Sequence, residues 1–193
     1  MRKHNEAVRV KISAEFSFFA VLGFLICTDR EGVSLLCMLA CLLHELGHLA
    51  VMLAERRLPS SITLYGGGIH ISGGSTSFPC AAAGVAVNTA LFLLFGLIPW
   101  EQRELRLFGV VNLLIAAFNL LPVGSLDGRL MLEKALVRGF SPKRAVFLSE
   151  LCERVMLIIL IPAAVMLVFS GFMNISAIIF LIYVFSVEFL EKI

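Results

Sequence analysis

The sequence predicts an all-α polytopic membrane protein: six transmembrane helices, with a short β-hairpin or re-entrant loop between the second and third spans. Of its 193 residues, 59% are hydrophobic and 16% are charged, and the mean hydropathy is +0.95. The apolar residues form separate runs, and the basic residues gather in alternate connections between those runs. We therefore expect a single membrane-embedded domain over residues 1–193, with its core at about 33–130 and support helices at about 146–190.

The six apolar runs are separated by charged breaks or by breaks that contain Gly and Pro. They cover residues of about 12–27, 33–54, 80–99, 106–122, 146–169 and 175–190. If the spans alternate in direction, most Lys and Arg residues fall on one side, and Arg30, Arg103 and Arg106 fall on the other. The positive-inside rule then places both termini in the cytoplasm of a multi-pass protein of the cell membrane.

Charge and cysteine content exclude two other classes of protein. The net charge of +2 is small and scattered, and no basic run is interleaved with aromatic residues, so nucleic-acid binding is not expected. The five cysteines are odd in number and lie mostly within apolar runs. They do not form the pattern of a disulfide framework, and we interpret them as packing residues.

The second apolar run contains His44-Glu45-Leu46-Gly47-His48. In a helix, residues four apart lie one turn, roughly 6 Å, from each other on one face, so both imidazoles can bind one metal ion. Glu45 lies beside the pair, where a carboxylate can take a proton from an attacking water. Such groups cost a few kcal/mol in hydrocarbon unless they are paired, metal-bound or in a wet cavity. The pattern therefore predicts one Zn²⁺ per chain and a hydrolase.

The fourth apolar run carries two asparagines seven residues apart on one helical face, Asn112 and Asn119, and ends at Pro122. Asp127 follows, and we expect it on irregular backbone near the cytoplasmic end of this span. The histidines of the second span are expected at the same depth. This predicts Asp127 as a third metal ligand, although an Asp-Gly pair after a helix is ordinarily only a turn.

Residues 61–74 contain two short alternating runs around three glycines, which predicts a β-hairpin whose edge could accept an extended peptide. A glycine-rich surface loop is the alternative. Gly67 in the turn and His70 in the second run are candidate supporting or substrate-binding residues, although His70 is more typical of a surface histidine than of a metal ligand.

The third apolar run is rich in small residues, which let helix backbones approach closely in lipid. Gly84 and Asn88 share one face of the predicted helix, so Asn88 should point into the bundle. We expect it, as a supporting residue like Asn112, to form hydrogen bonds between helices before any direct catalytic role.

Together these motifs resemble the site-2 protease family of intramembrane zinc metalloproteases, over about residues 33–130. The compact outline looks like the bacterial subgroup that includes the sporulation-factor-processing protease, without a PDZ or CBS domain. Two positions depart from the usual pattern: Val85 stands where a proline is common, and Arg129 where a second glycine is common. The matching parts are His44-Glu45-x-x-His48, Gly84-x-x-x-Asn88, Asn112, Phe118-Asn119-Leu-Leu-Pro122 and Leu126-Asp127-Gly128.

The resemblance implies that His44, His48 and Asp127 bind zinc, that Glu45 is the catalytic base, and that Asn119 stabilises the oxyanion. It also implies cleavage of a transmembrane or membrane-associated protein near the cytoplasmic face. The expected partners are that substrate, the lipid bilayer and a regulatory membrane protein. Two other functions stay open at this point: a non-catalytic scaffold that binds membrane proteins, and a zinc transporter.

Overall fold

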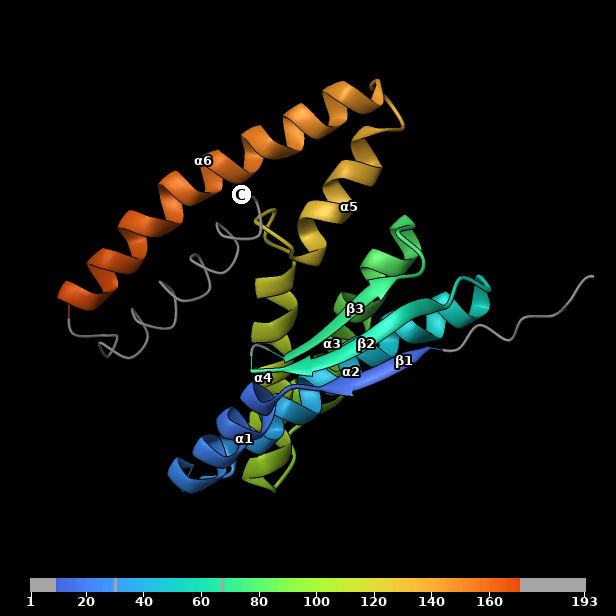
Figure 1. Cartoon of the computed structure of the whole chain (residues 1–193). Helices are drawn as coiled ribbons and strands as arrows, with labels where there is room; N and C mark the ends of the chain where they lie inside the picture. The colour runs from blue at the N-terminus through green and yellow to red at the C-terminus, as the bar shows by residue number, and fades with distance from the viewer. Residues whose placement is uncertain (1–9, 30, 67, 171–193) are drawn as a thin grey trace, which may run out of the picture. The chain divides into compact units, whose positions relative to one another are not determined.

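The computed structural model describes residues 10–29, 31–66 and 68–170. The described chain is mostly helical and divides into two compact units, Met1–Asn119 and Leu120–Ile193 (Figure 1). Among the described residues, the first unit holds four helices and a small sheet, and the second holds two helices. The helices are α1 Phe16–Thr28, α2 Val33–Ala54, α3 Phe78–Gly96, α4 Arg103–Asn119, α5 Asp127–Leu136 and α6 Pro142–Phe169.

Helices α2, α3 and α4 pack against one another and form the core of the first unit. Ala40 of α2 is fully buried and packs with Phe108 and Val111 of α4. Helix α3 begins after Ser77, whose hydroxyl accepts a hydrogen bond from the backbone N–H of Cys80 at 3.2 Å. That bond satisfies one of the N–H groups that a helix start leaves without a partner. This packing determines where the side chains of α2 and α3 meet.

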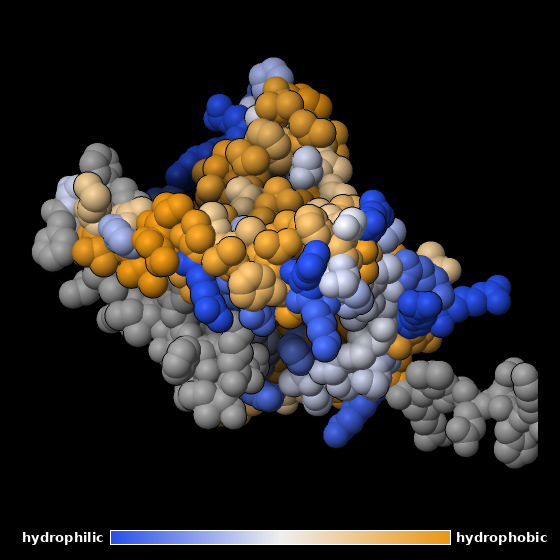
Figure 2. Space-filling model, turned by 90° about the horizontal axis from the view of Figure 1, so that it is seen from above, coloured by the Kyte–Doolittle hydropathy of each residue, from blue (hydrophilic) through white to orange (hydrophobic). Residues whose placement is uncertain are grey.

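Two described helices, α2 and α3, are long and apolar enough to cross a membrane, and the apolar part of α1, Phe16–Cys27, is shorter. Large apolar side chains are exposed on α1, for example Phe16 at 85% and Phe24 at 67%. Figure 2 shows broad apolar areas on the face in view, interrupted by hydrophilic residues. The number of six spans stays a prediction, and the sixth predicted span, 175–190, lies outside the described residues.

The predicted β-hairpin is confirmed. Strands β2, Pro59–Tyr65, and β3, Gly68–Gly73, pair antiparallel, with Ile62 opposite Ile71. Strand β2 packs against α1 and β3 against α2 (Figure 1). The sheet therefore lies on the helices of its own unit.

A third strand, β1 (Lys11–Ala14), pairs in parallel with β2, so that the order is β1-β2-β3. The expectation that the first span begins near residue 12 was therefore wrong at its start, because the helix begins only at Phe16. The short alternating run at 11–14 pairs with β2, and the hydroxyls of Ser13 and Thr63 lie 3.2 Å apart.

In the second unit, α5 packs against α6. Asp127 was expected on irregular backbone, but it is the first residue of α5. A carboxylate in the first turn interacts favourably with the helix dipole, which explains why the helix begins at this residue. Helix α6 begins at Pro142, four residues before the predicted span. Proline is common at the first position of a helix, where its missing N–H would have had no partner.

Candidate metal centre

Helix α2 places His44 and His48 one turn apart, and both side chains are buried, at 5% and 8% exposure. Gly47 lies between them where α2 meets α3. A Cβ added at Gly47 would lie 3.0 Å from the carbonyl oxygen of Ala83. The absence of a side chain at this position therefore lets the two backbones approach closely enough for α3 to enclose both imidazoles.

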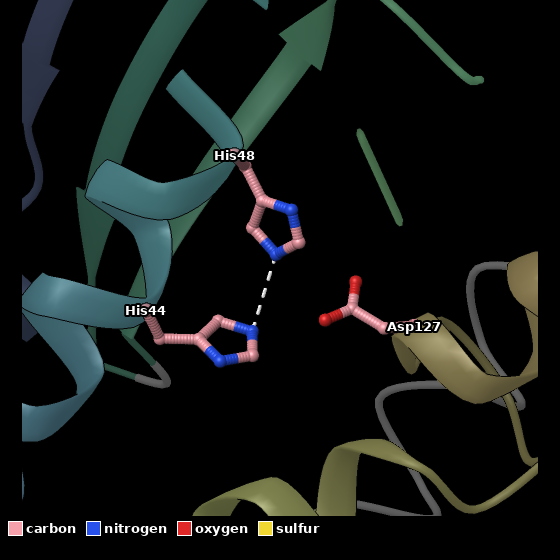
Figure 3. A group of neighbouring side chains, drawn as sticks. All are labelled: His44, His48 and Asp127. Atoms are coloured by element: carbon pink, nitrogen blue, oxygen red, sulfur yellow. Dashed lines mark hydrogen bonds between the residues drawn. The ribbon is translucent and has the colours of Figure 1, made fainter. Parts of the chain in front are cut away.

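The two imidazoles face one another through their Nε2 atoms, which are 3.2 Å apart (Figure 3). Two nitrogens that bind one tetrahedral zinc at bonds of ~2.05 Å lie about 3.3 Å apart. The spacing of the two Nε2 atoms therefore fits a pair of ligands to one zinc ion.

A backbone group of α3 determines which ring nitrogen of His48 carries the proton. Its Nδ1 lies 2.7 Å from the carbonyl oxygen of Cys80. Because a carbonyl only accepts hydrogen bonds, Nδ1 of His48 carries the proton and donates it. In the neutral ring Nε2 then presents its lone pair, which is the form that binds metal.

Asn88, which is fully buried, determines which ring nitrogen of His44 carries the proton. The amide NH₂ of Asn88 donates to the carbonyl of Ala40 at 3.2 Å and to Oδ1 of Asn112 at 2.7 Å. Its oxygen therefore faces His44, where it accepts a hydrogen bond from Nδ1 at 2.5 Å. His44 thus also presents Nε2 as a lone-pair donor.

Gly84 leaves the space beside both Nε2 atoms open. A Cβ at this position would lie 2.5 Å from Nε2 of His44 and 2.6 Å from Nε2 of His48. Real Cβ atoms essentially never show such contacts, so any larger residue would have to displace the rings. Space next to two convergent nitrogen lone pairs is what a bound metal ion requires.

The predicted direction of Asn88 into the bundle is confirmed, and its hydrogen bonds do link helices. They reach α2 and α4, since its partner Asn112 is fully buried and donates in turn to the carbonyl of Phe108 at 2.7 Å. Asn88 also contacts His44, a contact the spacing did not predict. Two buried amides thus join α3 and α4 to the histidine pair.

Glu45 and Asn119 both lie in the first unit, on different helices. Glu45 is half-buried on α2 between the two histidines. Asn119 is the last residue of α4 and is half-buried, and its amide donates to the carbonyl of Ile115 at 3.0 Å. An amide carries two N–H groups, so this bond uses one of the donors of Asn119.

Asp127 is half-buried at the start of α5 and offers one carboxylate (Figure 3). Because it belongs to the second unit, its role toward the two histidines is a proposal. His70 is exposed on β3, opposite Thr63, and is not among the described residues that could hold a metal ion together. Gly67 lies outside the described residues.

A cavity of about 550 Å³ lies in the first unit between α1, α2 and the turn end of the hairpin. Cys37 and Cys41 form part of its α2 wall. They lie four residues apart, and Glu45 is the next residue at that spacing. The cavity therefore borders the α2 ridge that carries Glu45.

No protein-family model matches the chain. The structure is similar to that of the site-2 protease of Methanocaldococcus jannaschii, with a TM-score of 0.58, 18% identity and coverage of 80% of each chain. The chain has the site-2 protease fold. This structural likeness agrees with the family resemblance of the sequence motifs.

One sequence relative carries the name of a zinc metalloprotease. A curated protein of Synechocystis sp., whose name proposes a zinc metalloprotease, is 38% identical to the chain over 98 residues. The match covers 44% of this chain and 26% of the relative, so the chain spans about a quarter of that protein's length. We therefore treat the activity as a proposal.

Two contacts of this site-2 protease fold were missed by the sequence reasoning. The carbonyl of Cys80 could not have been found, because every residue has one and only the α2–α3 packing selects it. Glu153 of α6 is buried at 5% exposure and could have been found, since an acidic residue inside a predicted span is itself a signal of a partner.

Proposed function

We propose that this protein is an intramembrane zinc metalloprotease that hydrolyses peptide bonds of a transmembrane or membrane-associated protein near the cytoplasmic face. The observation that carries the proposal is the pair of Nε2 atoms of His44 and His48, 3.2 Å apart and oriented by hydrogen bonds at both Nδ1 atoms. The site-2 protease fold and the zinc metalloprotease name of the Synechocystis relative support it.

His44, His48 and Asp127 would hold the zinc ion. Together they supply two imidazoles and one carboxylate, a donor set able to bind a metal ion. Three protein ligands leave the fourth tetrahedral position for water or substrate, which is the arrangement of catalytic rather than structural zinc. One zinc ion per chain is expected.

When bound, zinc would act as a Lewis acid that makes a water acidic near neutral pH and polarises the scissile carbonyl. Glu45 would take the proton from the attacking water and deliver it to the leaving amine, so that the proton count balances. Asn119 would donate a hydrogen bond to the oxyanion, a contribution of about 3 kcal/mol in other hydrolases.

The substrate would have to reach this site in extended form, because a helical peptide bond is enclosed by the hydrogen bonds of its own helix. The outer edge of β3 has no strand neighbour among the described residues, so it offers backbone groups to which an extended segment could pair. This step and the cytoplasmic orientation are parts of the proposal, as is the regulatory membrane partner.

The metal part is tested by zinc analysis of the purified protein in detergent. We expect close to one zinc per chain, lost on treatment with a chelator and restored by added zinc. Variants in which either histidine is replaced, His44→Ala and His48→Ala, should lose the metal. A wild-type protein that retains no zinc under these conditions would refute the proposed chemistry.

The protease part is tested by Glu45→Gln, which keeps the shape of the side chain and removes the base. Membrane proteomics should find fragments with new chain ends in cells that carry the native protein and in cells with the exposed-site control Glu104→Gln, but not with Glu45→Gln. Zinc content should be equal in all three proteins. Zinc transport without any such fragments would instead support the transporter.

A further inference from the structure

In the second unit, α6 is tied to the 120–126 loop, the segment that leads into Asp127. Glu153 of α6 accepts a hydrogen bond from the backbone N–H of Gly124 through Oε1, at 3.1 Å. Its Oε2 lies 3.3 Å from Nη1 of Arg129, which also donates to the carbonyl of Gly124 at 3.3 Å. The backbone N–H and the backbone carbonyl of Gly124 are therefore both bound by the members of one ion pair.

This ion pair is buried rather than solvated. The side chain of Glu153 is 7% exposed and that of Arg129 is 21% exposed. Surface ion pairs contribute little, but a buried carboxylate requires partners for its charge. The guanidinium and the Gly124 N–H are two such partners, so separating the ion pair would remove the opposite charge from a buried carboxylate.

Backbone geometry keeps the same loop in one shape. The N–H of Leu126 donates to the carbonyl of Val123 at 3.1 Å, closing a turn in which Gly124 has φ of +56°. Only glycine adopts such a φ readily. After the turn, Gly128 packs directly on the carbonyl of Leu120, where a Cβ would collide. The start of α5 is thus fixed against the start of the loop.

The sequence context of Arg129 is consistent with a specific partnership. Arg129 lies two residues after Asp127, in the first turn of α5. Glu153 is an acidic residue inside the apolar run 146–169. Each residue is costly alone in apolar surroundings, and each supplies the charge that the other needs.

We propose that Arg129 and Glu153 form a positioning clamp that holds the 120–126 loop and thereby fixes where α5 begins and where the Asp127 carboxylate points. They are positioning residues and do not themselves bind zinc. The part of this proposal that concerns zinc rests on the proposed function. The part that concerns the loop does not, because it depends only on contacts within the second unit.

The decisive variant replaces both members, Arg129→Met with Glu153→Met. Removing both charges avoids the buried unpaired charge that Glu153→Gln or Arg129→Gln leaves behind, so the double variant should fold with a melting temperature near that of the wild type. A clamp predicts that this well-folded protein still has a loosened loop. Arg154→Gln, at an exposed position of the same helix, is the matched control.

Two measurements follow the clamp. Hydrogen exchange of metal-free protein should be faster in the peptide covering residues 120–128 in the double variant than in the wild type or Arg154→Gln. Zinc affinity, measured by competition with a chromophoric chelator, should fall about 10- to 100-fold, as when other outer-sphere partners of metal ligands are removed. Glu153→Asp, which keeps the charge, should restore part of that loss relative to Glu153→Gln.

Unchanged exchange in 120–128 together with zinc affinity within twofold of the wild type would overturn the clamp. A wild-type protein that binds no zinc would refute the proposed function, and the exchange measurement would still decide whether the loop is clamped. Faster exchange with unchanged zinc affinity would overturn the assignment of Arg129 and Glu153 as positioning residues for Asp127.

Discussion

Asn88 accepts a hydrogen bond from Nδ1 of His44 at 2.5 Å, across the interface between α3 and α2. The two donors of the same amide are used by Ala40 and Asn112. The orientation of Asn88, and through it the tautomer of His44, is therefore set by the packing of three helices. Asn88 therefore both joins helices and orients His44, a candidate metal ligand.

Replacing Asn88 by leucine should weaken zinc binding by about 10- to 100-fold, because His44 loses the acceptor that holds its proton on Nδ1. The measurement is competition with a chelator of known affinity. Thr89→Val is the matched control, since Thr89 lies on the same helix and its hydroxyl donates to the carbonyl of Val85 within that helix. Equal zinc affinity in both variants would contradict the role of Asn88.

Asn112→Leu should destabilise the protein by about 1–3 kcal/mol, because the amide of Asn88 loses a buried partner. Adding Asn88→Leu removes both amides together and should recover much of that stability, while zinc affinity stays low. Unfolding followed by circular dichroism in a mild detergent, with zinc titration of the same samples, separates the two effects. Recovery of both quantities in the double variant would speak against a link between these amides and the metal centre.

Gly84→Ala should abolish zinc binding, because the added methyl group would lie 2.5–2.6 Å from both Nε2 atoms and displace the rings. Gly23→Ala is the control, since a Cβ on α1 at that position has nothing within 4 Å. That change should leave zinc content unaltered and can raise stability by up to ~1 kcal/mol through helix propensity. The measurement is the zinc content of the purified variants. One full zinc per chain in Gly84→Ala would disprove the assignment of the metal site to the space beside His44 and His48.

Stability should fall at acidic pH through Glu55, which follows α2. Hydrogen bonds from Ser75 and Ser77, the latter at 2.6 Å, hold the pKa of Glu55 below its ordinary value of 4.5. Because the folded pKa is lower than the unfolded one, this contribution is fully present above about 4.5 and is lost as pH falls through the folded pKa.

The melting temperature between pH 6 and pH 3 checks this expectation for Glu55. Glu55→Gln should remove part of the acid sensitivity, and Ser77→Ala should move the loss toward higher pH, because one of the donors that lower the pKa is gone. A Glu55→Gln protein with the same acid profile as the wild type would show that the cluster does not contribute.

Asn119→Ala should reduce cleavage by about 10²- to 10³-fold while zinc stays bound, if the amide donates to the oxyanion as proposed. The rate of fragment formation in membranes from cells that express each variant is the measurement, with zinc content as the control. A comparable loss of zinc would show that Asn119 supports the metal centre instead.

Helical spacing and apolar patterning were enough to predict several features that the structure confirms. The second predicted span, 33–54, coincides with α2, the hairpin is present, and Asn88 points into the bundle. Patterning failed where a segment's structure depends on a distant partner. Strand β1 depends on pairing with β2, and α5 begins at Asp127 in a stretch expected to be irregular.

By itself the sequence determined which residue types are available: two histidines one helical turn apart, a glutamate between them, and small residues on the facing helix. Periodicity encodes these features locally, because neighbours on one helix face are determined by spacing alone. Only the tertiary structure decided which nitrogen of each histidine presents its lone pair, since the acceptors are the Asn88 amide and the Cys80 carbonyl, 44 and 32 residues away. Likewise, only packing pairs Arg129 with Glu153, because close packing between helices depends on the fold as a whole.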